Sequence, residues 1–204
     1  MNFKTVAAIC VALYAIPGGV AYANLVTNGG FETENLDMSG NPIPPPPGWT
    51  ISGNGVGIDT VFPNNGNYDV SFGASTTDPN PGTLSQVIAT TPGQSYTINF
   101  ALLNEAGSAG NTFTVSFGGL TQTITGDTAT VYTLESFTAP GAGISSTSTM
   151  LLFIGLNDPA AWNLDDVSVT AATIGISEPR TSMLFGTALL VGCGMLRIRR
   201  RSLG

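Results

Sequence analysis

The sequence predicts an all-β fold, a sandwich of two stacked sheets that occupies residues 24–173. Short runs rich in Val, Ile, Thr, Tyr and Phe recur along this stretch, and Gly, Pro, Asn and Asp separate them. This spacing is typical of sandwiches and barrels. No segment between Asn24 and Thr173 has apolar residues at a helical period. We therefore expect nine or ten strands in two sheets.

The clearest predicted strand is Tyr96 to Leu102, whose alternate residues are apolar and form a core face. The run Met150 to Ile154 is apolar on both faces, which indicates a central strand. Trp49 and Trp162 are expected near strand ends in the core. The other candidate strands share this composition and are Trp49–Ile51, Val56–Val61, Tyr68–Phe72, Thr83–Ala89, Phe113–Phe117, Val131–Phe137 and Trp162–Thr170. The proline run 44–47 and the small-residue stretch 141–149 are predicted loops.

The first 23 residues have the layout of a secretory signal peptide. Lys4 supplies the positive charge, the run 6–16 is apolar, and Ala-Tyr-Ala ends at Ala23 in a small-x-small cleavage pattern. We expect cleavage between Ala23 and Asn24. The mature chain then begins at Asn24 with room for one domain.

All basic residues lie outside the predicted domain. The chain has six Lys and Arg, all in residues 1–23 or 174–204, whereas twelve of its thirteen acidic residues fall between Glu32 and Asp166. An acidic surface repels phosphate backbones and attracts cations, which argues against nucleic-acid binding. The chain has no His, and its two Cys lie in the terminal segments. Histidine-based catalysis, histidine metal sites and a disulfide within the domain are therefore excluded.

The C-terminal residues 174–204 read as a linker followed by a single membrane helix at 182–198. Four arginines, Arg197, Arg199, Arg200 and Arg201, end the apolar run. Such a cluster stays on the cytoplasmic side, so the domain should lie outside the membrane. The helix is short and contains three glycines, which suits transfer to a membrane partner. A permanent tail anchor is the alternative.

This tail resembles the PEP-CTERM sorting signal of Gram-negative bacteria. The residues that carry the resemblance are Ser177-Glu178-Pro179, the short helix and the arginine cluster. It departs from the family where Ser177 replaces Pro and where Arg180 replaces a small residue. The resemblance implies an exosortase-like membrane peptidase as partner, transient inner-membrane anchoring, and delivery to the cell surface or extracellular matrix.

Two adjacent carboxylates, Asp165 and Asp166, stand near the end of the predicted domain. Adjacent carboxylates repel each other, and the domain has no Lys or Arg to compensate them. A bound Ca²⁺ would compensate them, since it prefers carboxylate and carbonyl oxygens. The alternative is a solvated strand end. Because Asp165 shares parity with Val167 and Val169, we expect it to point inward.

A second resemblance covers about residues 24–170. The opening N-L-V-x-N-G-x-F-E, Gly48-Trp49, the Gly-Asn-Tyr at 66–68 and the closing L-D-D-V-S-V resemble galactose-binding-like jelly rolls, including family 4, 9 and 22 carbohydrate-binding modules. The resemblance implies a structural Ca²⁺ that joins the first and last strands. Its ligands would be the side chains of Glu32 and Asp165 and the carbonyl oxygens of Gly30 and Gly66.

Three functions remain open. The leading one is an exported, non-catalytic surface or matrix protein that binds carbohydrate or exopolysaccharide, with Tyr132 and Gln122 as candidates for an exposed sugar platform. The second is a structural surface or biofilm protein with no small ligand. The third is a carboxylate-based glycan hydrolase or lyase, because Asp, Glu and Tyr are the acid–base residues at hand.

Overall fold

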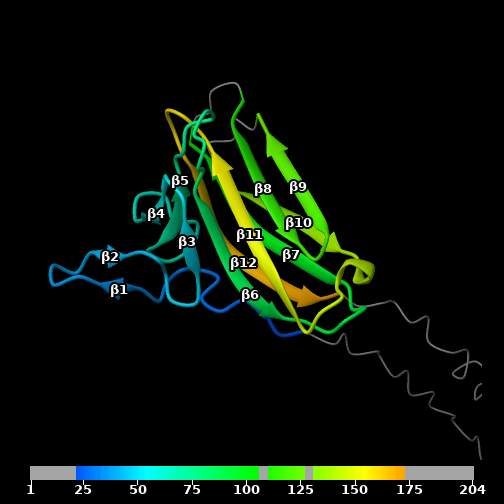
Figure 1. Cartoon of the computed structure of the whole chain (residues 1–204). Coiled ribbons are helices and arrows are strands. Elements are labelled where there is room, and N and C mark those ends of the chain that lie inside the picture. Colours follow the sequence, from blue (N-terminus) through cyan, green and yellow to red (C-terminus); the bar gives the residue numbers. More distant parts are fainter. Residues whose placement is uncertain (1–21, 106–109, 127–130, 173–204) are drawn as a thin grey trace, which may run out of the picture.

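The protein is a β-sandwich built from two five-stranded sheets that face each other (Figure 1). The computed structural model describes residues 22–105, 110–126 and 131–172. One sheet has the order β10-β7-β12-β5-β4 and the other has the order β3-β6-β11-β8-β9. The described strand pairs within both are antiparallel. The predicted all-β sandwich of two sheets is confirmed.

We call the first sheet the pocket sheet and the second the threonine sheet. The strands of the pocket sheet are β4 (Val56–Asp59), β5 (Asp69–Phe72), β7 (Tyr96–Asn104), β10 (Thr133–Ala139) and β12 (Trp162–Ala171). Those of the threonine sheet are β3 (Thr50–Ser52), β6 (Thr83–Ala89), β8 (Thr112–Phe117), β9 (Leu120–Thr125) and β11 (Ser148–Leu156).

Alternate residues of the strands fill the space between the sheets. The predicted core face of β7 is buried, and its Phe100 meets Phe153 of the opposite sheet edge-on with ring centroids 5.3 Å apart. Trp49 and Trp162 are 4% and 0% exposed, so both lie in the core as expected. Burying each such aromatic side chain contributes roughly 1.5–3 kcal/mol, so these rings dominate the stability of the sandwich.

The central position of β11 is also confirmed, because it lies between β6 and β8. Its first residue is Ser148, so the small-residue loop is shorter than predicted. A 3₁₀ turn, η1 (Gly141–Gly143), occupies the start of that loop. Thr149 instead pairs with Ile88 of β6.

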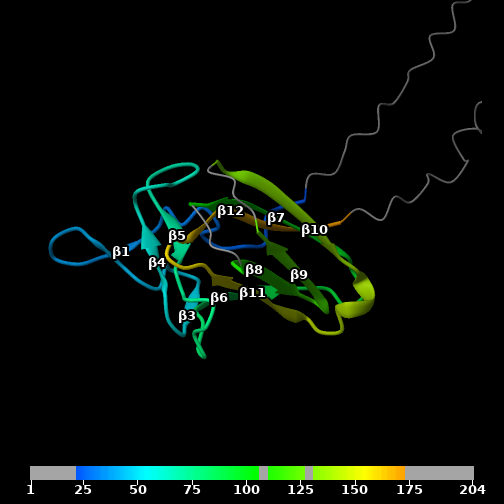
Figure 2. The ribbon, with the colours of Figure 1, turned by 90° about the horizontal axis from the view of Figure 1, so that it is seen from above.

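Two features were not predicted. The edge strand β9 alternates Thr with Leu120, Gln122 and Ile124, and it pairs with β8 through a tight turn at Gly118 and Gly119, which both have positive φ. The hairpin of β1 (Asn35–Leu36) and β2 (Pro42–Ile43) projects away from the sandwich in both ribbon views (Figures 1 and 2). The hairpin is short and leaves Leu36, Met38 and Ile43 exposed, so it lacks the alternation of a half-buried strand.

The two ends of the described chain lie side by side. Leu25 N–H donates to Val169 O at 2.9 Å, and Asn24 Oδ1 accepts the N–H of Val169 at 3.0 Å. The chain therefore enters and leaves the sandwich at the same end of β12. The predicted signal peptide core and the predicted membrane helix at 182–198 lie outside the described residues, and within those residues no helix is long and apolar enough to cross a membrane.

Candidate functional site

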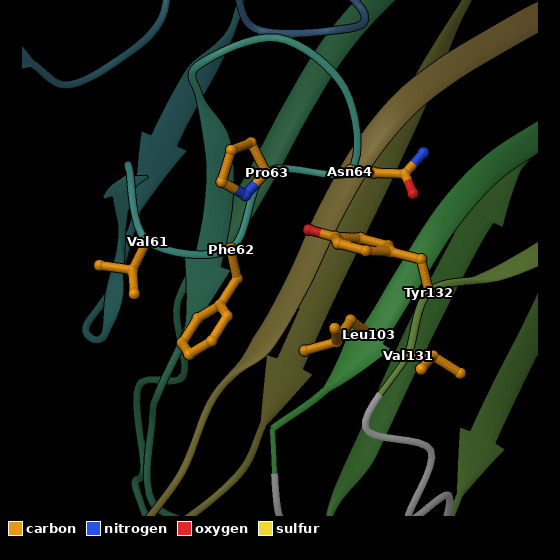
Figure 3. Close-up of a pocket in the computed structure, with 7 residues that line it drawn as sticks. All are labelled: Val61, Phe62, Pro63, Asn64, Leu103, Val131 and Tyr132. Carbon is orange, nitrogen blue, oxygen red and sulfur yellow. The ribbon is translucent and has the colours of Figure 1, made fainter.

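A pocket of about 480 Å³ lies on the outer face of the pocket sheet (Figure 3). This volume is within the range of small-ligand sites. The pocket lies between the loop that joins β4 to β5, called here the covering loop (residues 60–68), and the segment that leads into β10. Its lining residues are Val61, Phe62, Pro63, Asn64, Leu103, Val131 and Tyr132.

Register explains why these residues meet. Leu103 of β7 pairs with Asn163 of β12, and Tyr132 immediately precedes Thr133, which pairs with Leu102. Tyr132 thus stands beside Leu103 on the same outer face, since side chains alternate along a strand. In Figure 3, Phe62 lies on one side of the pocket and Tyr132 on the other.

Tyr132 is held in place by a buried acid. Its hydroxyl donates a 2.7 Å hydrogen bond to Asp69 Oδ2. Burial, and then this bond to the carboxylate, raise the pKa of Tyr132 far above its usual value. The phenol therefore stays neutral, and its hydroxyl is committed to Asp69. The ring rather than the hydroxyl is what Tyr132 offers to a ligand.

Apolar side chains are exposed around this pocket. Val61 and Val131 are each 67% exposed and Phe62 is 45% exposed. Exposed apolar side chains that cluster around a cavity are characteristic of binding sites. Together with the Tyr132 ring, they form a surface suited to the C–H faces of a polar ligand.

The covering loop is fastened by two carboxylates. Asp165 Oδ2 accepts the backbone N–H groups of Asn64 and Asn65 at 3.0 and 3.1 Å. Glu32 Oε1 accepts the N–H groups of Asn67 and Tyr68 at 2.7 and 2.9 Å. One wall of the pocket is therefore fixed to residues near both ends of the described chain.

The four predicted calcium ligands lie in two separate contacts: Gly66 lies against Glu32, and Gly30 lies near Asp165 and Asp166. A Cβ on Gly66 would lie 2.2 Å from Glu32 Cδ, so only glycine fits against that carboxylate. A Cβ on Gly30 would lie 3.6 Å from Asp166 Oδ1 and 4.0 Å from Asp165 Oδ1. Of these two glycines, only Gly66 is required by its contact. Carboxylates and backbone carbonyls are the oxygen donors that Ca²⁺ takes, but among the described residues no group of three or more acidic side chains is arranged to hold a metal.

Backbone N–H groups already compensate part of the charge on both acids. Glu32 Oε2 also accepts Asn67 Nδ2 at 3.1 Å, and Asp165 Oδ1 accepts the N–H of Asp166. A carboxylate offers about four lone pairs, so each acid retains about one for a cation. Slight burial acts to raise the pKa of Glu32, but the N–H donors outweigh it and lower that pKa. Burial raises the pKa of Asp165 to about 6.

Asp165 is fully buried, but on the other side of the strand from the predicted one. A bulge lies between Asp165 and Ser168, and Asp166 has a φ of 50°. The bulge shifts the alternation, so Val167 and Val169 face the core while Asp165 faces the covering loop. The parity prediction was wrong because it assumed an unbroken strand.

The two residues proposed as a sugar platform lie in different sheets. Tyr132 lines the pocket. Gln122 lies on β9, at the edge of the threonine sheet, opposite Val115. The structure does not bring these two residues together.

The sequence reasoning missed several acids around the site. Asp69 is fully buried beneath Tyr132. Both carboxylate oxygens of Glu34 are buried without a hydrogen-bond partner, and burial followed by the nearby Glu32 raises the pKa of Glu34 to about 7. Asp69 stands at the start of a predicted strand, but only the strand register could have revealed its partner.

The residues of the sorting motif, Ser177, Glu178, Pro179, Arg197, Arg199, Arg200 and Arg201, lie outside the described residues. Of the two residues at the predicted signal cleavage site, Ala23 is exposed, whereas Asn24 is bonded to β12 through Val169.

Comparisons with known proteins find similarity in fold. No protein-family model and no curated protein matches the chain. The carbohydrate-binding module TmCBM61, solved with β-1,4-galactotriose, is 17% identical and covers 74% of this chain and 99% of its own, with a TM-score of 0.53. A CBM4 structure is 18% identical, covers 72% and 99%, and has a TM-score of 0.51. A putative sugar binding protein from Bacteroides thetaiotaomicron is 13% identical, covers 74% and 100%, and has a TM-score of 0.53.

Proposed function

We propose that the protein is an exported, non-catalytic surface or matrix protein that binds a neutral glycan in the pocket beside Tyr132. The observation that carries this proposal is the pocket itself, where the Tyr132 ring, fixed by Asp69, stands across from Phe62. A preorganised aromatic ring with apolar neighbours suits the C–H face of a sugar. Carbohydrate-binding modules of the same fold give the proposal its ligand class.

Charge favours neutral glycans over acidic ones. None of the described residues is Lys or Arg, and Asp69 and Asp165 lie close enough to the Tyr132 phenol to raise its pKa. An anionic polysaccharide would approach the negative charge buried behind the pocket, with no cationic side chain among the described residues to attract it. Uronic-acid-rich polymers should therefore bind more weakly than neutral ones of the same linkage.

The non-catalytic part of the proposal has support in the lining. Glycoside hydrolysis generally uses two carboxyl groups that flank the scissile bond. The described residues that line the pocket are apolar or amide side chains plus one tyrosine, with no Asp or Glu among them. Incubation with the bound polysaccharide should therefore release no new reducing ends.

The geometry also suits a domain tethered by its tail. The pocket lies beside Asn163, next to the first residue of β12, whereas the chain leaves the sandwich after Ala171, the last residue. At about 3.3 Å per residue, roughly 25 Å separate these points. A tail that continues from that end of β12 therefore starts well away from the pocket. An exosortase-like peptidase as sorting partner, and a Gram-negative surface as destination, rest on the sequence of residues 177–201.

A Ca²⁺ ion at Glu32 and Asp165 belongs to the same proposal. It would use the remaining oxygens of both carboxylates and tie the two ends of the described chain to the covering loop. The ion is structural, because it stabilises one wall of the pocket and takes no part in chemistry.

The experiment is a glycan array probed with the purified full-length chain, followed by calorimetry on the best neutral hit. Phe62→Ala should weaken binding about tenfold, since an aromatic contact of this kind is worth about 1.4 kcal/mol. Val87→Ala is the matched control, because Val87 is 68% exposed on the opposite sheet. Binding to no glycan, or equal losses in both variants, would contradict the proposal.

A further inference from the structure

Three carboxylates surround the side chain of Asn163 on the outer face of the pocket sheet. Asp59 of β4 is the register partner of Asp69 of β5. Glu105 follows β7 directly, two residues after Leu103, which pairs with Asn163. The Asn163 side chain lies 3.5 Å from Asp59 Oδ2 and close enough to Asp69 and Glu105 to lower both pKa values. All three acids therefore meet at one amide group.

The charges in this cluster are not compensated by a cation. Burial first, and then the other carboxylates of the cluster, raise the pKa of Asp69 to about 6 and also raise that of Glu105. No Lys or Arg occurs in residues 22–105, 110–126 or 131–172. Mutual repulsion among acids favours a bound cation over an empty cluster.

Two oxygen atoms of the cluster are buried and unsatisfied. Asp69 and Asn163 are each 0% exposed. Asp69 Oδ2 accepts the Tyr132 hydroxyl, but Asp69 Oδ1 accepts no hydrogen bond, and neither does Asn163 Oδ1. Buried polar atoms without partners are rare in folded proteins and call for a ligand or an ordered water.

The amide of Asn163 can serve a cation after a simple rotation. Its nitrogen now faces the carboxylates, and a half-turn about the last side-chain bond exchanges nitrogen and oxygen at almost the same positions. The rotated oxygen would join the carboxylates of Asp59, Asp69 and Glu105. Within the described residues no three acidic side chains already lie at metal-binding distances, so the carboxylates as well as the amide have to rotate when the ion binds. The flexible coordination of Ca²⁺, with water as additional ligand, accommodates the adjustment.

We propose that Asp59, Asp69, Glu105 and Asn163 form a binding site for one divalent cation of the calcium type, distinct from the site at Glu32 and Asp165. The ion compensates most of the negative charge of the cluster and gives Asp69 Oδ1 a partner. Because Asp69 also accepts the Tyr132 hydroxyl, the ion fixes the ring that forms one side of the pocket. It also fixes the start of the covering loop, since Asp59 Oδ1 accepts the N–H groups of Thr60 and Val61.

The test is calcium titration calorimetry on the purified full-length chain after removal of metals with a chelator and without any glycan. The wild-type chain should bind two ions. Asp59→Asn and Glu105→Gln remove partly exposed acids, so both variants should fold, and each should weaken one of the two sites at least about tenfold. Asp165→Asn should weaken the other site. Asp158→Asn removes an exposed carboxylate elsewhere and is the matched control.

The outcomes separate the two sites. If Asp59→Asn and Glu105→Gln bind as many ions as Asp158→Asn, with equal affinity, the inference is overturned. A single wild-type ion that is lost in Asp165→Asn and retained in Asp59→Asn also overturns it. A single wild-type ion that is lost in Asp59→Asn and retained in Asp165→Asn supports this site and argues against the one at Glu32 and Asp165. Since no sugar is present, the result is independent of whether the pocket binds glycan.

Discussion

Replacing Gly66 by alanine is expected to detach the covering loop from Glu32. Gly66 has a φ of 79°, and an added Cβ would lie 2.3 Å from Glu32 Oε1. The carboxylate cannot keep its place at that distance. It would lose its bonds to the N–H groups of Asn67 and Tyr68 and to the Asn67 side chain.

The size of the effect follows from two contributions. A left-handed backbone conformation costs an alanine about 1–2 kcal/mol. Losing the three hydrogen bonds of Glu32 adds about 1–3 kcal/mol in total. Each bond contributes little, because this side chain is exposed and water replaces part of the loss. Gly66→Ala should therefore lower the free energy of unfolding by about 2–5 kcal/mol.

Gly93 provides a matched control for the backbone contribution. Its φ is also 79°, but an added Cβ would meet no atom within 4 Å. Gly93→Ala should cost only about 1–2 kcal/mol, and the loss of chain freedom in the unfolded state is the same in both variants. Urea denaturation of both variants measures the difference. Equal midpoints and equal slopes would refute the reasoning, because the contact with Glu32 would then contribute nothing.

Three further outcomes are expected. In calorimetry with the best glycan, Tyr132→Ala should weaken binding about tenfold, whereas Tyr132→Phe, which keeps the ring, should lose less; equal losses would mean that the hydroxyl is the ligand contact. Ca²⁺ at a hundredfold excess over Kd should add about 2.7 kcal/mol of stability, so the melting temperature should rise. Asp165→Asn should reduce this rise more than Asp166→Asn. A melting temperature of the wild-type chain that does not change with Ca²⁺ would contradict the site. Alanine at both Glu178 and Pro179 should leave a larger, membrane-retained form in cells with a cognate exosortase, as judged by fractionation; mass spectrometry that finds the intact tail on the wild-type surface pool would exclude sorting by cleavage.

Composition and alternation were sufficient to predict most of the fold. The strand from Thr83 to Ala89 matches β6 residue for residue, and the core face of β7 follows directly from its period of two. Strand β6 has one buried and one more exposed face, and in β7 every second residue from Tyr96 to Leu102 is apolar and buried, which leaves a clear pattern in the sequence. In strand β9 the pattern is weaker, because Gln122 stands between Leu120 and Ile124 and the threonines of this edge strand face solvent.

The site was harder to predict because it depends on register and on one loop. The nearness of Glu32 to Gly66, and of Asp165 to the same loop, agrees with the resemblance to carbohydrate-binding modules. The bulge after Asp165 was not predicted, since a single extra residue leaves no signature in composition. Asp69 and Asn163 reach one another only through the pairing of β5 with β12, and no local pattern encodes that pairing.

The central claim is that the pocket of the pocket sheet is where a glycan binds, and ligand mapping by backbone-amide NMR tests it most directly. Titrating the isotope-labelled full-length chain with the best neutral oligosaccharide should shift the amide signals of Phe62, Asn64, Leu103 and Tyr132, which line the pocket. Signals of the opposite sheet, such as those of Thr114 and Thr123, should stay in place. Shifts confined to that opposite sheet, with the pocket signals unchanged at saturation, would contradict the account.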